Sequence, residues 1–276
     1  MLDAVILGLI QALTEFLPVS SSGHLKLGHA WLGYDAPDDL LFDVLLHVGT
    51  LVAVFFVYRK RIGSLIAGVA RGVAALPGGP RAALAAHEGL RYLVLIIIAT
   101  LPTAVIGLAL EDWVETGITS PRAVGGLLLV NGAILFASRW TKGEGAAATG
   151  PLAVGGLGPR QALLIGIVQG IAVLPGISRS GSTIVAALAL GAARLEAAEF
   201  SFFLSIPAIL GAVILKVDPE LLASSTELPA YLAGASVSAI GGVAALTLLL
   251  GVVRSARLHR FAFYCWLIGL VAVTVG

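Results

Sequence analysis

Six stretches of this chain are each long and apolar enough to cross a lipid bilayer. A transmembrane helix needs about 20 predominantly apolar residues. Charged residues make up only 12% of the 276 residues, against roughly 25% in a typical soluble domain. So few charges cannot cover a water-soluble surface, and we predict an all-α polytopic membrane protein. The six predicted transmembrane helices are Leu40–Tyr58, Arg91–Leu110, Arg122–Trp140, Phe200–Lys216, Pro229–Val253 and Phe261–Gly276.

Basic residues are concentrated in alternate connections between these spans. Arginine and lysine cluster in 59–91, 139–160 and 254–260, whereas the other connections carry mainly Asp and Glu. Because basic connections stay cytoplasmic, the acidic ones are predicted to lie outside. We interpret Ile62–Ala86 as a short interfacial helix and loop, and Gly143–Gly158 as a linker.

Other features of the chain exclude several classes of protein. The N-terminal segment has no basic region and no small-residue cleavage site, so we expect no removable signal peptide. A formal net charge of +1 gives no reason to expect a nucleic-acid partner. The single cysteine, Cys265, excludes a disulfide framework and a thiolate zinc site.

Two further apolar segments, Leu2–Gly33 and Arg160–Leu190, are interrupted by Pro, Gly and Ser, and they resemble one another. The first contains GLIQALTEFLPVSSSGH and the second GIVQGIAVLPGISRSGS. Three predicted spans separate them, so the second copy is inverted relative to the first. We therefore predict two re-entrant helix-loop-helix segments in inverted-topology repeats (1–140 and 160–276, linker 141–159) that form one membrane domain. The pairs that are 158 residues apart are Gly8/Gly166, Gln11/Gln169, Ser20/Ser178, Ser22/Ser180 and Gly23/Gly181.

In both copies a Ser/Gly loop runs into the start of a short helix. Free backbone N–H groups and the helix dipole make such a terminus suitable for an anion, phosphate in particular. Irregular backbone at membrane depth is tolerated only when it is buried in protein or lines a wet cavity, so we expect the two loops to meet. Close packing of small residues is the alternative explanation of the serines. The candidate substrate-binding residues are Gln11, Ser20, Ser22, Gly23, Gln169, Ser178, Ser180, Gly181, Ser182 and Thr183.

Four residues in these segments supply reactive or charged groups. Glu15 lies one helical turn after Gln11, Ser21 follows in the loop, and His24 opens the next half-helix. Arg179 lies in the second loop, where an arginine is costly and usually functional. Together they supply a base, an acid, a nucleophile and a charge clamp, which phosphoryl transfer requires. We therefore predict all four as catalytic, with a structural hydrogen-bonding role as the alternative for His24.

Asp43 and His47 lie one turn apart near the outer end of the first span and can border the same cavity. For this pair we favour structural hydrogen bonding.

Three segments together resemble a known family. They are QALTEFLPVSSSGH at Gln11–His24, PGISRSGST at Pro175–Thr183, and FDVLLHVGTLVAVFFVYRKR at Phe42–Arg61. The chain resembles, over essentially its whole length, the undecaprenyl-diphosphatases of the bacitracin-resistance type, which are integral enzymes of the bacterial cytoplasmic membrane. The resemblance implies removal of the terminal phosphate of undecaprenyl diphosphate on the outer face of that membrane. This reaction recycles the lipid carrier for peptidoglycan synthesis and confers bacitracin resistance.

The resemblance also implies residue roles and partners. The functional glutamate of the family falls on Glu15, its loop serine on Ser21, its histidine on His24 and its arginine on Arg179. Many members have a first glutamate where this chain has Gln11, so Glu15 is the only carboxylate of the motif. A divalent cation, Mg²⁺ or Ca²⁺, is implied to assist, although the sequence shows no ligand cluster; no organic cofactor is expected. The expected partners are the polyprenyl diphosphate and membrane lipids, and a homodimer is compatible with this architecture.

The main alternative is a transporter or flippase for a polyprenyl phosphate or another anion without hydrolytic activity. Inverted repeats with paired re-entrant segments also form carriers. Anion transport requires the arginine but does not require an acid–base pair such as Glu15 and His24. A purely structural scaffold would leave Glu15 and Arg179 unexplained. Whether a phosphoserine forms or water attacks directly stays open at this point.

Overall fold

The computed structural model describes residues 1–32, 39–118, 120–141, 153–218, 220, 222 and 225–276. Two short segments among the described residues are 3₁₀ helices at the ends of longer helices, η1 (Leu76–Gly78) and η2 (Ser138–Trp140), and a third, η3 (Leu258–Arg260), precedes the last helix. The α-helices are, in chain order, α1 (Leu2–Phe16), α2 (Ser21–Leu32), α3 (Asp39–Ala75), α4 (Pro80–Ala86), α5 (Glu88–Gly117), α6 (Pro121–Ala137), α7 (Pro159–Ile171), α8 (Arg179–Ala189), α9 (Arg194–Lys216), α11 (Leu228–Arg254) and α12 (Phe261–Val275).

Six helical segments of the described chain are long and apolar enough to span a membrane, which confirms the predicted number. Each overlaps its predicted span, and most begin or end a few residues beyond it. The chain is therefore a multi-pass membrane protein. The six segments are Leu41–Gly78, Glu88–Val114, Pro121–Trp140, Arg194–Lys216, Leu228–Arg254 and Leu258–Val275.

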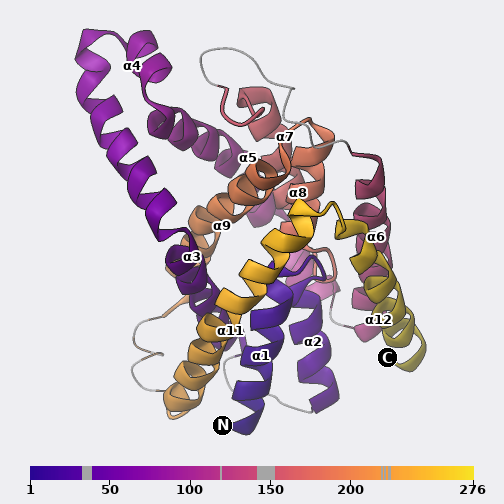
Figure 1. Cartoon of the computed structure of the whole chain (residues 1–276). Helices are drawn as coiled ribbons and strands as arrows, with labels where there is room; N and C mark the ends of the chain where they lie inside the picture. Colours follow the sequence, from indigo (N-terminus) through magenta and orange to yellow (C-terminus); the bar gives the residue numbers. More distant parts are fainter. Residues whose placement is uncertain (33–38, 119, 142–152, 219, 221, 223–224) are drawn as a thin grey trace.

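The prediction of an interfacial helix and loop over Ile62–Ala86 is wrong for most of its length. Helix α3 continues without a break to Ala75, and its 37 residues make it about 55 Å long. Only η1 and α4 turn away from it, at the tip visible in Figure 1. Gly68 and Gly72 do not end the helix, because they pack closely against α5: a Cβ at Gly72 would lie 2.8 Å from Cβ of Leu90. The linker predicted over Gly143–Gly158 lies outside the described residues up to position 152.

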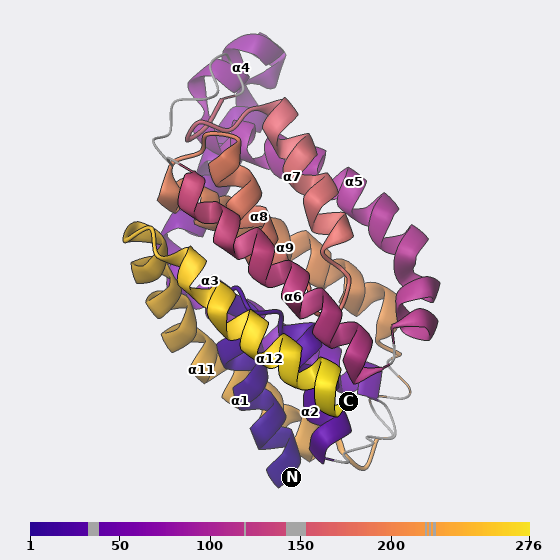
Figure 2. The same cartoon turned by 90° about the vertical axis from the view of Figure 1, so that its right-hand side faces the viewer.

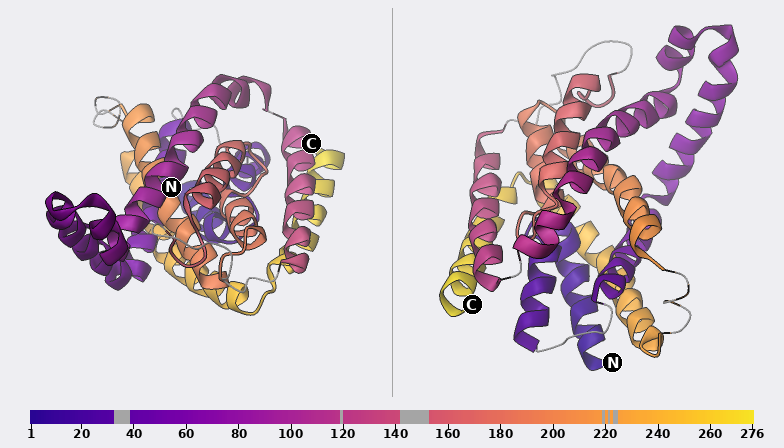
Figure 3. Two further views of the ribbon diagram at one scale, coloured as in Figure 1. Left: turned by 90° about the horizontal axis from the view of Figure 1, so that it is seen from above. Right: turned by 180° about the vertical axis from the view of Figure 1, so that it is seen from behind.

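The two interrupted segments form the helix pairs α1–α2 and α7–α8. Figure 1 shows α1 and α2 at the end of the molecule that holds both termini, whereas α7 and α8 lie toward the end that holds α4. Seen from above in Figure 3, the two pairs lie in the centre and the long helices surround them. The breaks between the helices of each pair therefore meet in the middle of the bundle.

Glycines set the close approach of helices around this centre, as is usual where helices pack within a bilayer. In α1, Gly8 packs on the backbone carbonyl of Gly234 in α11, and in α7, Gly166 packs on the carbonyl of Ala99 in α5. Gly8 and Gly166 are 158 residues apart, so the two helix pairs use equivalent sequence positions for the same kind of contact. Helices α6 and α12, which lie side by side in Figure 2, approach each other closely through a glycine of each helix in the same way.

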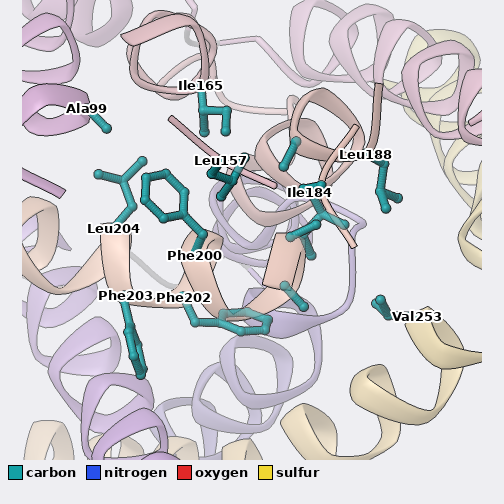
Figure 4. Close-up of a cluster of buried hydrophobic side chains, with 14 of the residues drawn as sticks. Ala99, Leu157, Ile165, Ile184, Leu188, Phe200, Phe202, Phe203, Leu204 and Val253 are labelled. Atoms are coloured by element: carbon teal, nitrogen blue, oxygen red, sulfur yellow. The ribbon is translucent and has the colours of Figure 1, made fainter. Parts of the chain in front are cut away.

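Three aromatic side chains of α9, Phe200, Phe202 and Phe203, belong to a buried hydrophobic cluster (Figure 4). Phe202 packs edge-on against Phe16, with 5.7 Å between ring centroids. Phe200 meets Tyr92 of α5 at 5.9 Å. Phe200 and Phe202 are fully buried, so the end of α1 that carries Glu15 and Phe16 packs against the buried core.

Candidate active site

The break in the first helix pair is shaped by proline and by one residue in a left-handed conformation. Helix α1 ends at Phe16, Pro18 follows, and Ser20 has a φ of 72°. The Ser20 hydroxyl oxygen accepts a hydrogen bond from the backbone N–H of Gly23 at 3.3 Å, which caps α2. It also accepts one from the N–H of Gly176 at 3.0 Å. Ser20 therefore joins its own helix to the other loop.

The break in the second pair repeats this arrangement. Gly176 has a φ of 109°, and the Ser178 hydroxyl accepts a hydrogen bond from the N–H of Gly181 at 3.0 Å to cap α8. The two breaks also touch symmetrically. A Cβ at Gly23 would lie 2.9 Å from the Gly176 nitrogen, and one at Gly181 would lie 2.9 Å from Cβ of Pro18. Since positions 18 and 176, like 23 and 181, differ by 158, each contact is the repeat of the other.

Asn131 of α6 links the two breaks, and sequence reasoning missed it. Its side-chain amide donates to the carbonyl of Pro18 at 3.0 Å and accepts from the N–H of Ser178 at 3.0 Å. The residue is fully buried. A signal existed in the sequence, because a buried amide within an apolar span is costly and marks a site.

Glu15 is the centre of the polar cluster. Its Oε1 atom pairs with Nη2 of Arg179, so the carboxylate and the guanidinium come from different helix pairs. Its Oε2 atom accepts hydrogen bonds from the Ser21 hydroxyl at 2.6 Å and from Nε2 of Gln11 at 3.1 Å. Only 6% of Glu15 is exposed, and this network compensates for the burial of its charge.

His47 of α3 also faces this carboxylate, with its Nε2 atom 3.5 Å from Oε2 of Glu15. The other ring nitrogen, Nδ1, lies 2.7 Å from the backbone carbonyl of Asp43. The side chain of Asp43 points to α2, with Oδ1 lying 3.4 Å from Nε2 of His29. The hydrogen bond to the Asp43 carbonyl is the structural role that we favoured for His47. His47 also lines the cavity in front of Glu15.

His24 is not brought to the Glu15 cluster. Its ring stacks on Tyr264 of α12 with 5.6 Å between centroids. Nε2 lies 3.0 Å from the Tyr264 hydroxyl, and Nδ1 lies 2.8 Å from the carbonyl of Ser20. The ring therefore supports the first loop from the side of α12.

The other predicted substrate-binding residues fall into two groups. Ser22, Ser178, Ser180 and Gln169 line the same cavity as Glu15 and Arg179. The hydroxyls of Ser182 and Thr183 lie within buried α8 residues, where Thr183 donates to the carbonyl of Arg179 at 2.8 Å. Thr183 is thus placed to support the arginine, whereas the Ser182 hydroxyl has no hydrogen-bond partner in the described structure.

The cavity in front of Glu15 has a volume of about 500 Å³, with a polar lining at one end and mainly apolar walls elsewhere. Its polar end is the cluster of Glu15, Ser21, His47 and Arg179. Its apolar walls come from α5 and α9, around Leu108 and its neighbours. Two charged residues at the far end, Glu111 of α5 and Lys216 of α9, form an ion pair between these helices. Such a cavity suits a molecule with an anionic head and a long apolar tail.

The described residues do not form a ready-made metal site. No group of three or more His, Cys, Asp or Glu side chains among them is arranged to hold a metal ion. Both oxygens of the Glu15 carboxylate are already engaged by hydrogen-bond donors. The residues at the head of the cavity therefore do not fit a cation held by the protein alone.

A multi-pass membrane protein with a carboxylate, a hydroxyl and a guanidinium buried at the head of an amphipathic cavity has the features of a membrane-embedded enzyme that acts on lipid phosphates. The chain belongs to the BacA family: the family model described as "Bacitracin resistance protein BacA" matches residues 4–271.

Curated relatives are similar over their full length, and each carries the name undecaprenyl-diphosphatase. The protein of Desulfatibacillum aliphaticivorans is 46% identical, with 100% of this chain and 98% of the relative covered. The protein of Desulfosudis oleivorans is 44% identical with the same coverage. The protein of Methanosphaera stadtmanae is 40% identical, again over 100% and 98%.

Proposed function

We propose that this protein hydrolyses undecaprenyl diphosphate to undecaprenyl phosphate and phosphate. The observation that carries the proposal is the contact of Glu15 with both Ser21 and Arg179 at the head of a cavity with apolar walls. Membership of the BacA family and the shared name of the relatives support the same substrate. The terminal phosphate would lie at the polar end, and the first part of the polyprenyl chain would lie along α5 and α9.

In this proposal the side chains divide the chemistry as follows. Ser21, or a water molecule in its place, attacks the terminal phosphorus, and Glu15 accepts the proton of the attacker across the 2.6 Å contact. Arg179 and the N–H groups at the starts of α2 and α8 neutralise the charge that develops on the phosphoryl oxygens. His24 supports the loop that leads to Ser21, through its contact with the carbonyl of Ser20. A divalent cation would arrive on the diphosphate oxygens, which is a common mode of Mg²⁺ binding.

We further propose that α1–α2 and α7–α8 are re-entrant segments of inverted repeats, 1–140 and 160–276. The contacts related by a shift of 158 residues support this topology. The cavity extends from the central breaks toward Glu111 and Lys216, beside connections that are predicted to lie outside because they are acidic. The active site would therefore open to the outer side of the bacterial cytoplasmic membrane, where hydrolysis recycles the carrier lipid for peptidoglycan synthesis and withdraws the target of bacitracin.

The test is phosphate release from undecaprenyl diphosphate by the purified protein in detergent. We expect the wild type to be active, and Glu15→Ala and Arg179→Ala each to lower kcat roughly 10²- to 10⁴-fold. Thr247→Ala is the matched control, because the Thr247 hydroxyl contacts only a carbonyl of its own helix in the described structure. Hydrolysis retained in both active-site variants would refute the assignment. Transfer of labelled lipid between leaflets by a wild type that releases no phosphate would favour the transporter instead.

A further inference from the structure

We propose that His47 is a proton-relay residue: it takes from Glu15 the proton that the attacking hydroxyl has released. The inference rests on the proposed function. The relay would run from the Ser21 hydroxyl to Oε2 of Glu15 and on to Nε2 of His47. The two steps are set by contacts of 2.6 Å and 3.5 Å to the same carboxylate oxygen.

The backbone fixes which nitrogen of His47 can accept a proton. Nδ1 lies 2.7 Å from the carbonyl of Asp43, and a carbonyl can only accept a hydrogen bond, so Nδ1 carries the hydrogen. In the neutral ring Nε2 therefore presents a lone pair to Glu15. Two lone pairs that face one another gain nothing, whereas a proton between them makes a hydrogen bond. The contact consequently becomes favourable only after the attacker has lost its proton, which is the differential stabilisation that catalysis needs.

A second acid–base group is needed because Glu15 is held in its charged form. Arg179 of α8 pairs with its other oxygen, and Gln11 and Ser21 donate to Oε2. A proton left on this carboxylate would weaken the ion pair. An imidazole can both accept and release a proton, so the His47 ring is a suitable place to hold the proton between steps.

His47 has a defined set of ionisable neighbours and a route to water. Glu15 from α1 faces its Nε2 atom, and Arg179 from α8 pairs with the other oxygen of that carboxylate. On its own helix lies Asp43, whose side chain is approached by His29 of α2. At the distant end of the cavity lie Glu111 and Lys216. The His47 side chain is 28% exposed, against 5% for that of Glu15, so the proton can leave through the cavity.

The step is balanced in atoms and charge. The attacking oxygen forms a bond to the terminal phosphorus, and the bond from this phosphorus to the bridging oxygen breaks with its electron pair on undecaprenyl phosphate. The proton of the attacker passes to Glu15 and then to Nε2 of His47. His47 ends as the imidazolium ion and Glu15 returns to the carboxylate beside Arg179.

The experiment is the pH dependence of hydrolysis in wild type, His47→Gln and His47→Asn. Glutamine can donate a hydrogen bond to Glu15 and asparagine can keep the one to the carbonyl of Asp43, but neither accepts a proton. In the wild type we expect kcat to fall on the acid side of neutral, because the relay needs a neutral ring. Both variants should lose this decline, and kcat at neutral pH should fall by about 10²-fold with KM changed less than about twofold.

His29→Gln is the control, because it removes an imidazole near Asp43 that is not part of the relay. Its pH profile should match that of the wild type. If His47→Gln or His47→Asn elutes as a folded protein and keeps the acid-side decline, the relay is refuted, whatever the size of its kcat. If the wild type itself releases no phosphate, the proposed function fails, and this outcome is distinct from an unchanged profile in active variants.

Discussion

Replacing Asn131 with leucine tests how the two helix breaks are held together. Leucine has a similar size and suits the apolar surroundings, but it offers neither a donor nor an acceptor. The carbonyl of Pro18 and the N–H of Ser178 would each lose a partner that now lies at 3.0 Å. Asn131 is fully buried and Ser178 is 2% exposed, so water cannot easily replace the amide.

The magnitude follows from these two groups. The Pro18 carbonyl would keep only a weak contact with Sγ of Cys265 at 3.9 Å, whereas the Ser178 N–H would have no partner left in the described structure. A buried polar group left without a partner costs about 1–3 kcal/mol, so we expect a loss of at least about 1–3 kcal/mol in the free energy of unfolding. Activity should fall as well, because the same loops carry Ser21 and Arg179, and a misplacement of about 1 Å can cost on the order of 10²-fold in rate.

The assay combines unfolding of the detergent-solubilised protein by titration with a denaturing detergent and phosphate release under native conditions. Thr247→Ala serves as the control, since it removes an exposed hydroxyl that bonds to its own helix, and its effect should stay within about 0.5 kcal/mol. An Asn131→Leu protein that matches the wild type in both measurements would show that the amide does not join the loops.

Two further predictions concern glycines. Gly23→Ala should destabilise the protein and lower its activity, because the new Cβ would lie 2.9 Å from the Gly176 nitrogen. Gly63→Ala meets no atom within 4 Å, so it should be neutral or stabilise α3 by up to about 1 kcal/mol. Equal melting temperatures of the two variants would contradict this expectation. Gly107→Leu and Gly211→Leu should fill open space in the apolar part of the cavity. They should therefore slow hydrolysis of undecaprenyl diphosphate more than that of a short-chain prenyl diphosphate, and equal losses for both substrates in steady-state assays would argue against a tail along α5 and α9.

Much of the architecture was predictable because the signals are local. An apolar stretch of sufficient length must cross the bilayer as a helix, and all six predicted spans are present among the described residues. The breaks after Phe16 and after Ile171 were predictable as well, since Pro18, Pro175 and Gly176 disfavour the continuation of a helix. The error over Ile62–Ala86 arose because two of the glycines that suggested a loop, Gly68 and Gly72, instead pack α3 against α5.

Which side chains form the site depended on the tertiary structure. Motif residues Glu15, Ser21 and Arg179 meet as expected, but the direction of each remaining side chain is set by the helix that packs beside it. Packing against α12 turns His24 toward Tyr264, and the position of α3 beside α1 brings His47 to the carboxylate. The chain alone determines where helices start, stop and break, because those preferences act over a few residues. Which polar groups converge is decided by contacts between helices that are far apart in the sequence.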